Sequence, residues 1–287
     1  MSISIPRTDQ HKHNVIKQFN EACSRHNRFS IWSDFIVMTA ISISNIVDKS
    51  HAVAREDTYK SLVKKYTKEE LSCFAQMFRE IVLGIDACPD QDFLGELFMA
   101  MELGNQHNGQ FFTPYTVCRA MAAITYGNDL KEKIKRQGWV SVSDPACGAG
   151  ALLIAFANEC RRPGNDVNYQ TSVLFAAQDI DLVAGLMCYI QLSLLGCPGY
   201  VSIADTLTEP TTSLDDHGLI PVPSENIWYT PFYFRDVWHW RRMMAQLEML
   251  FKSEPSKVQH LSDASVEHEA EPTPLTEASQ DQLLMVL

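Results

Sequence analysis

The chain has 287 residues, of which 46% are hydrophobic, and a formal net charge of −11 at pH 7. This length allows one large domain with a smaller accessory one, and the hydrophobic content is sufficient for a buried core. The negative charge argues against a protein that binds DNA on its own, because such binding rests on Lys and Arg neutralising phosphates.

No run reaches the ~18 apolar residues of a membrane helix, and residues 1–14 are polar without an apolar signal segment. The eight cysteines are scattered without a C-x-x-C pair, which is typical of reduced, buried thiols rather than zinc ligands or disulfides. These features predict a soluble, cytoplasmic protein with no metal site and no membrane attachment.

The pattern along the chain divides it into three parts. Apolar residues spaced at i, i+3 and i+4 with little Pro or Gly predict a helical N-terminal domain over residues 1–105. Residues 106–251 alternate strand-like and helix-like segments, which predicts an α/β doubly wound sheet. Within this part, residues 208–226 have loop composition and residues 235–251 an amphipathic helical pattern.

The last part, residues 252–287, is rich in Ser, Pro, Glu and Thr and carries seven acidic residues against two lysines. Without apolar periodicity, such a segment is predicted to be a disordered acidic tail. Its apolar end, Leu283 to Leu287, either docks as a short peptide or frays.

The most informative segment is Asp-Pro-Ala-Cys-Gly-Ala-Gly at residues 144–150, between a strand-like segment at 139–143 and a helix-like one at 152–157. Glycines let the backbone approach a ligand closely, and a helix N-terminus offers unpaired N–H groups. The segment resembles motif I of the methyltransferases that use S-adenosyl-L-methionine (SAM), in the D-P-A-C-G-[ST]-G form of DNA adenine-N6 methyltransferases.

Three other segments extend this resemblance over roughly residues 91–207. Residues 109–114, Gly-Gln-Phe-Phe-Thr-Pro, resemble motif X of type I restriction-modification modification subunits, and residues 92–97 resemble the D-x-L-G-x-x-[YF] helix before it. Residues 173–181 form a strand-like run containing Gln178-Asp179, where an acid can accept ribose hydroxyls, and resemble motif II. Residues 201–207, with Asp205, resemble motif III, which lies near the adenine of SAM.

The resemblance implies an α/β, Rossmann-like SAM-dependent methyltransferase sheet with an N-terminal helical domain. It also implies that SAM is bound by Gln110, Phe112, Thr113, Pro114, Asp144, Ala146, Gly148, Ala149, Gly150, Asp179 and Asp205. Structural roles compete with this one. Asp179 could cap the helix that follows it, Asp205 could form a turn, and Phe112 could be a core aromatic.

Motif IV, [DNS]-P-P-[YFW], is not intact. In this family its first side chain and a prolyl carbonyl accept hydrogen bonds from the target amine, while the aromatic residue stacks on the flipped base. The nearest counterpart is residues 230–233, Thr-Pro-Phe-Tyr, so Thr230, Pro231 and Tyr233 are the predicted catalytic residues. A threonine hydroxyl is shorter than an amide or carboxylate. The alternative is an ordinary buried, aromatic strand.

Two functions follow from these residues. The first is a DNA adenine-N6 methyltransferase that transfers the methyl group of SAM and acts within restriction-modification. The second is a catalytically inactive scaffold or regulatory subunit that still binds SAM. The expected partners are DNA, bound weakly by the isolated chain, and a specificity or other protein subunit.

Overall fold

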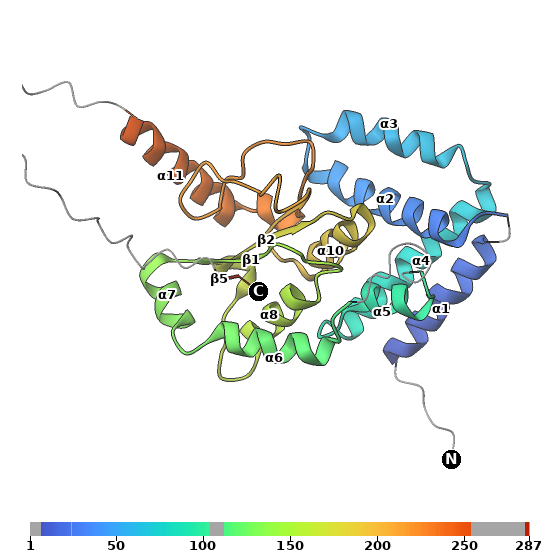
Figure 1. The fold of residues 1–287 in the computed structure, drawn as a ribbon, viewed down its shortest axis with the longest axis horizontal. Helices are drawn as coiled ribbons and strands as arrows, with labels where there is room; N and C mark the ends of the chain where they lie inside the picture. The colour runs from blue at the N-terminus through green and yellow to red at the C-terminus, as the bar shows by residue number, and fades with distance from the viewer. Residues whose placement is uncertain (1–6, 24, 104–111, 254–284, 287) are drawn as a thin grey trace, which may run out of the picture.

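The computed structural model describes residues 7–23, 25–103, 112–253 and 285–286. At its centre is a five-stranded sheet in the order β4-β3-β2-β1-β5 (Figure 1). The strands are β1 (Val140–Asp144), β2 (Val173–Asp179), β3 (Gly199–Ile203), β4 (Ile227–Tyr229) and β5 (Met285–Val286). Neighbouring strands are parallel except β4, which runs antiparallel to β3. The predicted α/β sheet is confirmed.

The N-terminal part is helical, as predicted. Its helices are α1 (Arg7–Ala22), α2 (Arg28–Val47), α3 (Ala52–Val63), α4 (Lys68–Ala87) and α5 (Phe93–Ala100). Local signals set their starts: the Asn27 side chain caps α2, and Thr67 with Glu70 forms a capping box at α4. These helices lie together beside the sheet (Figure 1). α2 is long and apolar enough to span a membrane by length and composition, but more than half of its apolar window is buried inside the fold.

The remaining helices surround the sheet. They are α6 (Tyr115–Tyr126), α7 (Leu130–Gln137), α8 (Ala151–Arg161), α9 (Tyr169–Ser172), α10 (Leu182–Leu195), the 3-10 turn η2 (Pro231–Phe234) and α11 (Asp236–Ser253). α8 and α10 pack against the parallel strands, and α10 also packs against α2. One continuous core therefore joins the helical region to the sheet. A smaller core, which includes Tyr200, Tyr233 and Trp238, lies between the sheet and α11.

Arg55 fastens the helical region to the edge strand β4. Its side chain is 7% exposed and pairs with the buried Asp48 at 2.9 Å. The guanidinium group also donates to the carbonyl oxygen of Ile227 at 2.7 Å and lies 3.8 Å from the centroid of the Trp228 ring. The pair with Asp48 joins α3 to the end of α2, and the two contacts with Ile227 and Trp228 join both helices to a strand about 170 residues later in the chain.

The C-terminal segment differs from its prediction. α11 continues to Ser253, and Met285–Val286 pair in parallel with Val142 and Ser143 of β1. The prediction of a disordered tail is therefore wrong at these residues, because the edge of β1 offers unpaired backbone groups that a strand satisfies. The rest of the predicted tail, residues 254–284, and the predicted domain boundary at residues 105–106 lie outside the described residues.

Candidate functional site

A cavity of about 250 Å³ opens at the carboxyl ends of β1 and β2, next to the start of α6. In a doubly wound sheet this is where ligands bind. Seven of the eleven residues predicted to bind SAM line it: Phe112, Thr113, Asp144, Ala146, Gly148, Ala149 and Asp179. Three segments that are distant in sequence, residues 112–113, 144–149 and 179, thus meet around one cavity.

The turn after β1 is fastened to the end of β2. The N–H of Gly148 donates to Asp179 Oδ2 at 2.7 Å, and the N–H of Cys147 donates to the carbonyl oxygen of Gln178 at 2.9 Å. Gly148 and Gly150 have φ values of 52° and 92°, in the left-handed region that favours glycine. The glycines of this motif are therefore required by the backbone that forms the cavity wall.

Asp179 does not cap α10. The N-cap is Asp181, whose side chain accepts from the N–H of Ala184 at 2.8 Å. Asp179 instead accepts the N–H groups of Gly148 and Asp181, so its carboxylate is held by the backbone at the cavity wall. Each carboxylate oxygen can accept further hydrogen bonds, which leaves Asp179 able to accept the hydroxyls of a bound ribose.

The cavity is acidic. Burial raises the pKa of Asp144 to about 6, and the negative charge of Asp179 contributes to this increase. The hydrogen bond from the N–H of Ala146 acts in the opposite direction and lowers the pKa. Asp144 Oδ2 is buried and has no hydrogen-bond partner among the described residues. Burial also raises the pKa of Asp92 and of Asp179. The described residues that line the cavity include these three carboxyl groups and no Lys, Arg or His, so the cavity favours a cationic ligand.

Phe112 belongs to both the core and the cavity. Its ring centroid lies 5.4 Å from that of Phe98, and its edge would lie 3.1 Å from a Cβ atom added to Gly148. The ring therefore closes over the glycine turn, and a side chain at Gly148 would displace it.

Three other predicted cofactor residues, Pro114, Gly150 and Asp205, are not among the residues that line the cavity. Pro114 starts α6, and Gly150 starts α8. Asp205 accepts the N–H of Leu207 at 2.9 Å, as the turn alternative predicts. Gln110 lies outside the described residues.

The prediction that Thr230 is a catalytic residue is wrong. Its side chain is fully buried, donates to the carbonyl oxygen of Cys197 at 2.7 Å, and accepts the N–H of Gly199 at 3.0 Å. These partners are at the amino end of β3, whereas the cavity is at the carboxyl ends of the parallel strands. Because β4 runs antiparallel to β3, it brings the chain to the amino ends of the parallel strands, opposite the cavity, before Thr230 is reached.

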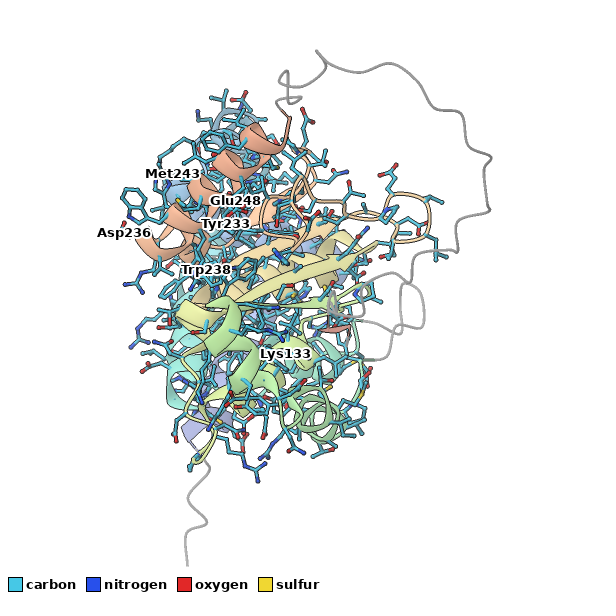
Figure 2. The ribbon with its side chains drawn as sticks, turned by 90° about the vertical axis from the view of Figure 1, so that its left-hand side faces the viewer. Lys133, Tyr233, Asp236, Trp238, Met243 and Glu248 are labelled. Atoms are coloured by element: carbon cyan, nitrogen blue, oxygen red, sulfur yellow. The ribbon has the colours of Figure 1, made fainter. Side chains whose placement is uncertain are left out.

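The predicted catalytic roles of Pro231 and Tyr233 fail for the same reason. Pro231 opens the turn η2, and Tyr233 is 4% exposed, with its hydroxyl donating to the carbonyl oxygen of Leu219 at 2.8 Å. Its ring stacks on that of Tyr229 at 4.8 Å. Tyr233 lies where α11 meets the sheet (Figure 2). It is a core residue, as the buried-aromatic alternative predicts, and cannot receive a flipped base.

Two polar residues of the site, Asp92 and Gln191, were not predicted from the sequence. Asp92, at the start of α5, lines the cavity although it was noted only as part of a helix motif. Gln191 lies behind the cavity, is 1% exposed, and hydrogen-bonds both Asp92 and the carbonyl oxygen of Ala149. The sequence feature that could have indicated Gln191 is its amide side chain in the largely apolar helix α10. Among the described residues, no group of three or more His, Cys, Asp or Glu could hold a metal ion.

Comparison with known proteins identifies a family. A model of the N-6 DNA Methylase family matches residues 92–252. No curated protein matches. A solved type I restriction-modification methyltransferase subunit from Streptococcus thermophilus is 13% identical, with a TM-score of 0.39 over 70% of this chain and 59% of that one.

A second solved structure, from Listeria monocytogenes, is assigned to the class I S-adenosylmethionine-dependent methyltransferases. It is 21% identical, with a TM-score of 0.33 over 64% of this chain and 57% of that one. This chain therefore spans less than two thirds of either protein. The family match, in contrast, covers more than half of the chain, from Asp92 at the cavity to Lys252 in the last turn of α11, and this protein therefore belongs to the N-6 DNA methylase family.

Proposed function

We propose that this protein is a SAM-dependent DNA methyltransferase that transfers the methyl group of SAM to the N6 amine of adenine. The observation that carries the proposal is the acidic cavity between the glycine turn of residues 144–150 and Asp179. Membership of the N-6 DNA methylase family supports the reaction class.

The residues of the cavity fit SAM. SAM carries a sulfonium and an ammonium group against one carboxylate, so its net charge suits a cavity with three carboxyl groups and no lining cation. Asp179 would accept the ribose hydroxyls, as an acid at the end of the second strand does in related folds. The ligand would also bring positive charge near the unpaired Oδ2 of Asp144. When bound, SAM supplies the electrophilic methyl group.

We further propose that DNA reaches this site together with a second protein subunit. The net charge of −11 gives the chain few means of neutralising phosphates. A partner that contributes Lys and Arg side chains would supply that contact. On this proposal, the isolated chain binds DNA weakly and methylates it more efficiently once the partner is added.

Cofactor binding is tested by calorimetry with three proteins. Asp179→Ala should weaken SAM binding by about 2 to 3 kcal/mol, the scale of charge-assisted hydrogen bonds to two hydroxyls. Asp205→Ala is the matched control, because Asp205 is an acid in the turn after β3 that does not line the cavity. Equal losses in both variants would contradict the placement of the ribose at Asp179.

Methyl transfer is tested with methyl-labelled SAM and DNA of mixed sequence, with N6-methyladenine as the product measured. We expect label in DNA for the wild type and much less for Asp179→Ala. Tight SAM binding without transfer to DNA, with or without a partner subunit, would refute the enzyme and leave the inactive SAM-binding scaffold.

A further inference from the structure

Asp92 enters the cavity from a different side than Asp179. It stands at the start of α5, whereas Asp179 ends β2. Cys118 of α6 lines the cavity together with Asp92, so this carboxyl group lies at the α5 and α6 side. A ligand whose ribose lies at Asp179 therefore has a second buried acid at the α5 and α6 side of the cavity.

The hydrogen bonds that described residues donate to Asp92 both go to the same carboxylate oxygen. Oδ1 accepts the N–H of Gly95 at 2.9 Å and the side-chain amide of Gln191 at 2.8 Å. No described residue donates a hydrogen bond to Oδ2, although the residue is only 3% exposed. An N-cap role accounts for Oδ1 alone, since it needs one acceptor and no contact with a cavity.

Gln191 holds Asp92 in place. Its Nε2 donates to Asp92 Oδ1 and to the carbonyl oxygen of Ala149, both at 2.8 Å, and its Oε1 accepts the N–H of Leu94 at 3.1 Å. Both N–H groups of the Gln191 amide, and its oxygen, thus have hydrogen-bond partners inside the fold. The amide thus ties the start of α5 to the glycine turn and fixes the orientation of the Asp92 carboxyl group.

Asp92 lines the cavity and is 3% exposed, and burying a carboxylate is costly unless a cation and hydrogen bonds compensate its charge. No lining residue supplies one, and the nearby Lys12 pairs with Glu96 at the surface. We propose that Asp92 receives the α-ammonium group of the methionine part of SAM, and that Gln191 positions it to do so. This inference rests on the proposed function, because it assumes that the cavity holds SAM.

The experiment compares two ligands that differ in the amino-acid part. S-adenosylhomocysteine carries the α-ammonium group, and 5′-methylthioadenosine has the same adenosine and sulfur without it. Asp92→Asn should weaken S-adenosylhomocysteine binding by about 10- to 100-fold, the loss expected for one charge-assisted hydrogen bond. Binding of 5′-methylthioadenosine should change less than about twofold. Calorimetry measures both, and circular dichroism checks that the variant is folded.

Glu96→Gln is the control, since it removes a negative charge from α5 at an exposed position, and it should change neither affinity. The inference is overturned if the wild-type protein binds the deaminated analogue of S-adenosylhomocysteine as tightly as S-adenosylhomocysteine itself. Equal weakening of both ligands by Asp92→Asn, or no weakening, would overturn it as well. A wild type that binds neither nucleoside would overturn the proposed function and this inference together.

Discussion

Replacing Asp144 by Asn should stabilise the ligand-free protein at neutral and alkaline pH. The buried carboxyl group has a pKa of about 6 in the folded protein against 3.8 for an unperturbed side chain. At about 1.36 kcal/mol per pKa unit, ionising it in the folded state costs about 3 kcal/mol more than in the unfolded chain. The amide of Asn carries no charge and can still accept the N–H of Ala146, so it avoids most of this cost.

The sign of the pH dependence follows from proton binding. Between pH values of about 4 and 6, the folded wild type holds a proton on Asp144 that the unfolded chain has released, so this group contributes less to stability as pH rises. Above the folded pKa the penalty is complete. The stability of Asp144→Asn relative to wild type should therefore grow by about 2 kcal/mol between about pH 4.5 and about pH 8.

Urea unfolding of both proteins at these two pH values measures the difference. A stability difference that stays constant with pH, or that favours the wild type more at the higher pH, would refute the reasoning. The same substitution should weaken SAM binding, because it removes a negative charge from the cavity. Gain of stability with loss of affinity is the expected pattern for a group retained for ligand binding.

Thr230→Val should lower stability by about 1 to 3 kcal/mol in urea unfolding, through its lost buried hydrogen bonds, and leave SAM affinity unchanged; lost SAM binding would contradict its placement. Gly150→Ala should lower the melting temperature of the protein more than Gly164→Ala. Both glycines have φ above 90°, but an added Cβ would lie 2.8 Å from Cys188 Sγ at Gly150 and within 4 Å of no atom at Gly164. Equal melting temperatures of the two variants would exclude that overlap. Deleting residues 285–287 should promote self-association in sedimentation by unpairing the β1 edge; an unchanged monomer would argue against β5.

The cavity was predictable because its determinants are local. A strand, a glycine turn and a helix follow each other within residues 139–157, and the acid after the second strand lies beside that turn in a parallel sheet. Asp144, Gly148 and Asp179 could therefore be named from their order in the sequence. The direction of β4 had no such local signal. A short apolar strand can pair with its neighbour in parallel or antiparallel. That direction decides whether Thr230, which follows β4, lies at the carboxyl ends of the parallel strands beside the cavity or at their amino ends.

Gln191 and β5 were not predictable for a related reason. The contact between Gln191 and Asp92 spans 99 residues, and one amide in an apolar helix does not indicate its partner. Met285–Val286 end a polar segment, and their pairing depends on the unoccupied edge of a strand far earlier in the chain. Both contacts are set by tertiary structure rather than by sequence pattern.

The buried Arg55 affects how the protein unfolds. Its bonds to β4, together with the packing of α2 on α10, mean that the helices cannot separate from the sheet without exposing a charged pair and part of the shared core. Loss of one partner of such a pair costs several kcal/mol. Heating should therefore produce one cooperative calorimetric transition, and a fragment lacking the N-terminal helices should not retain a folded sheet. The helical region is therefore a structural part of the same folding unit as the sheet rather than a module that could be exchanged.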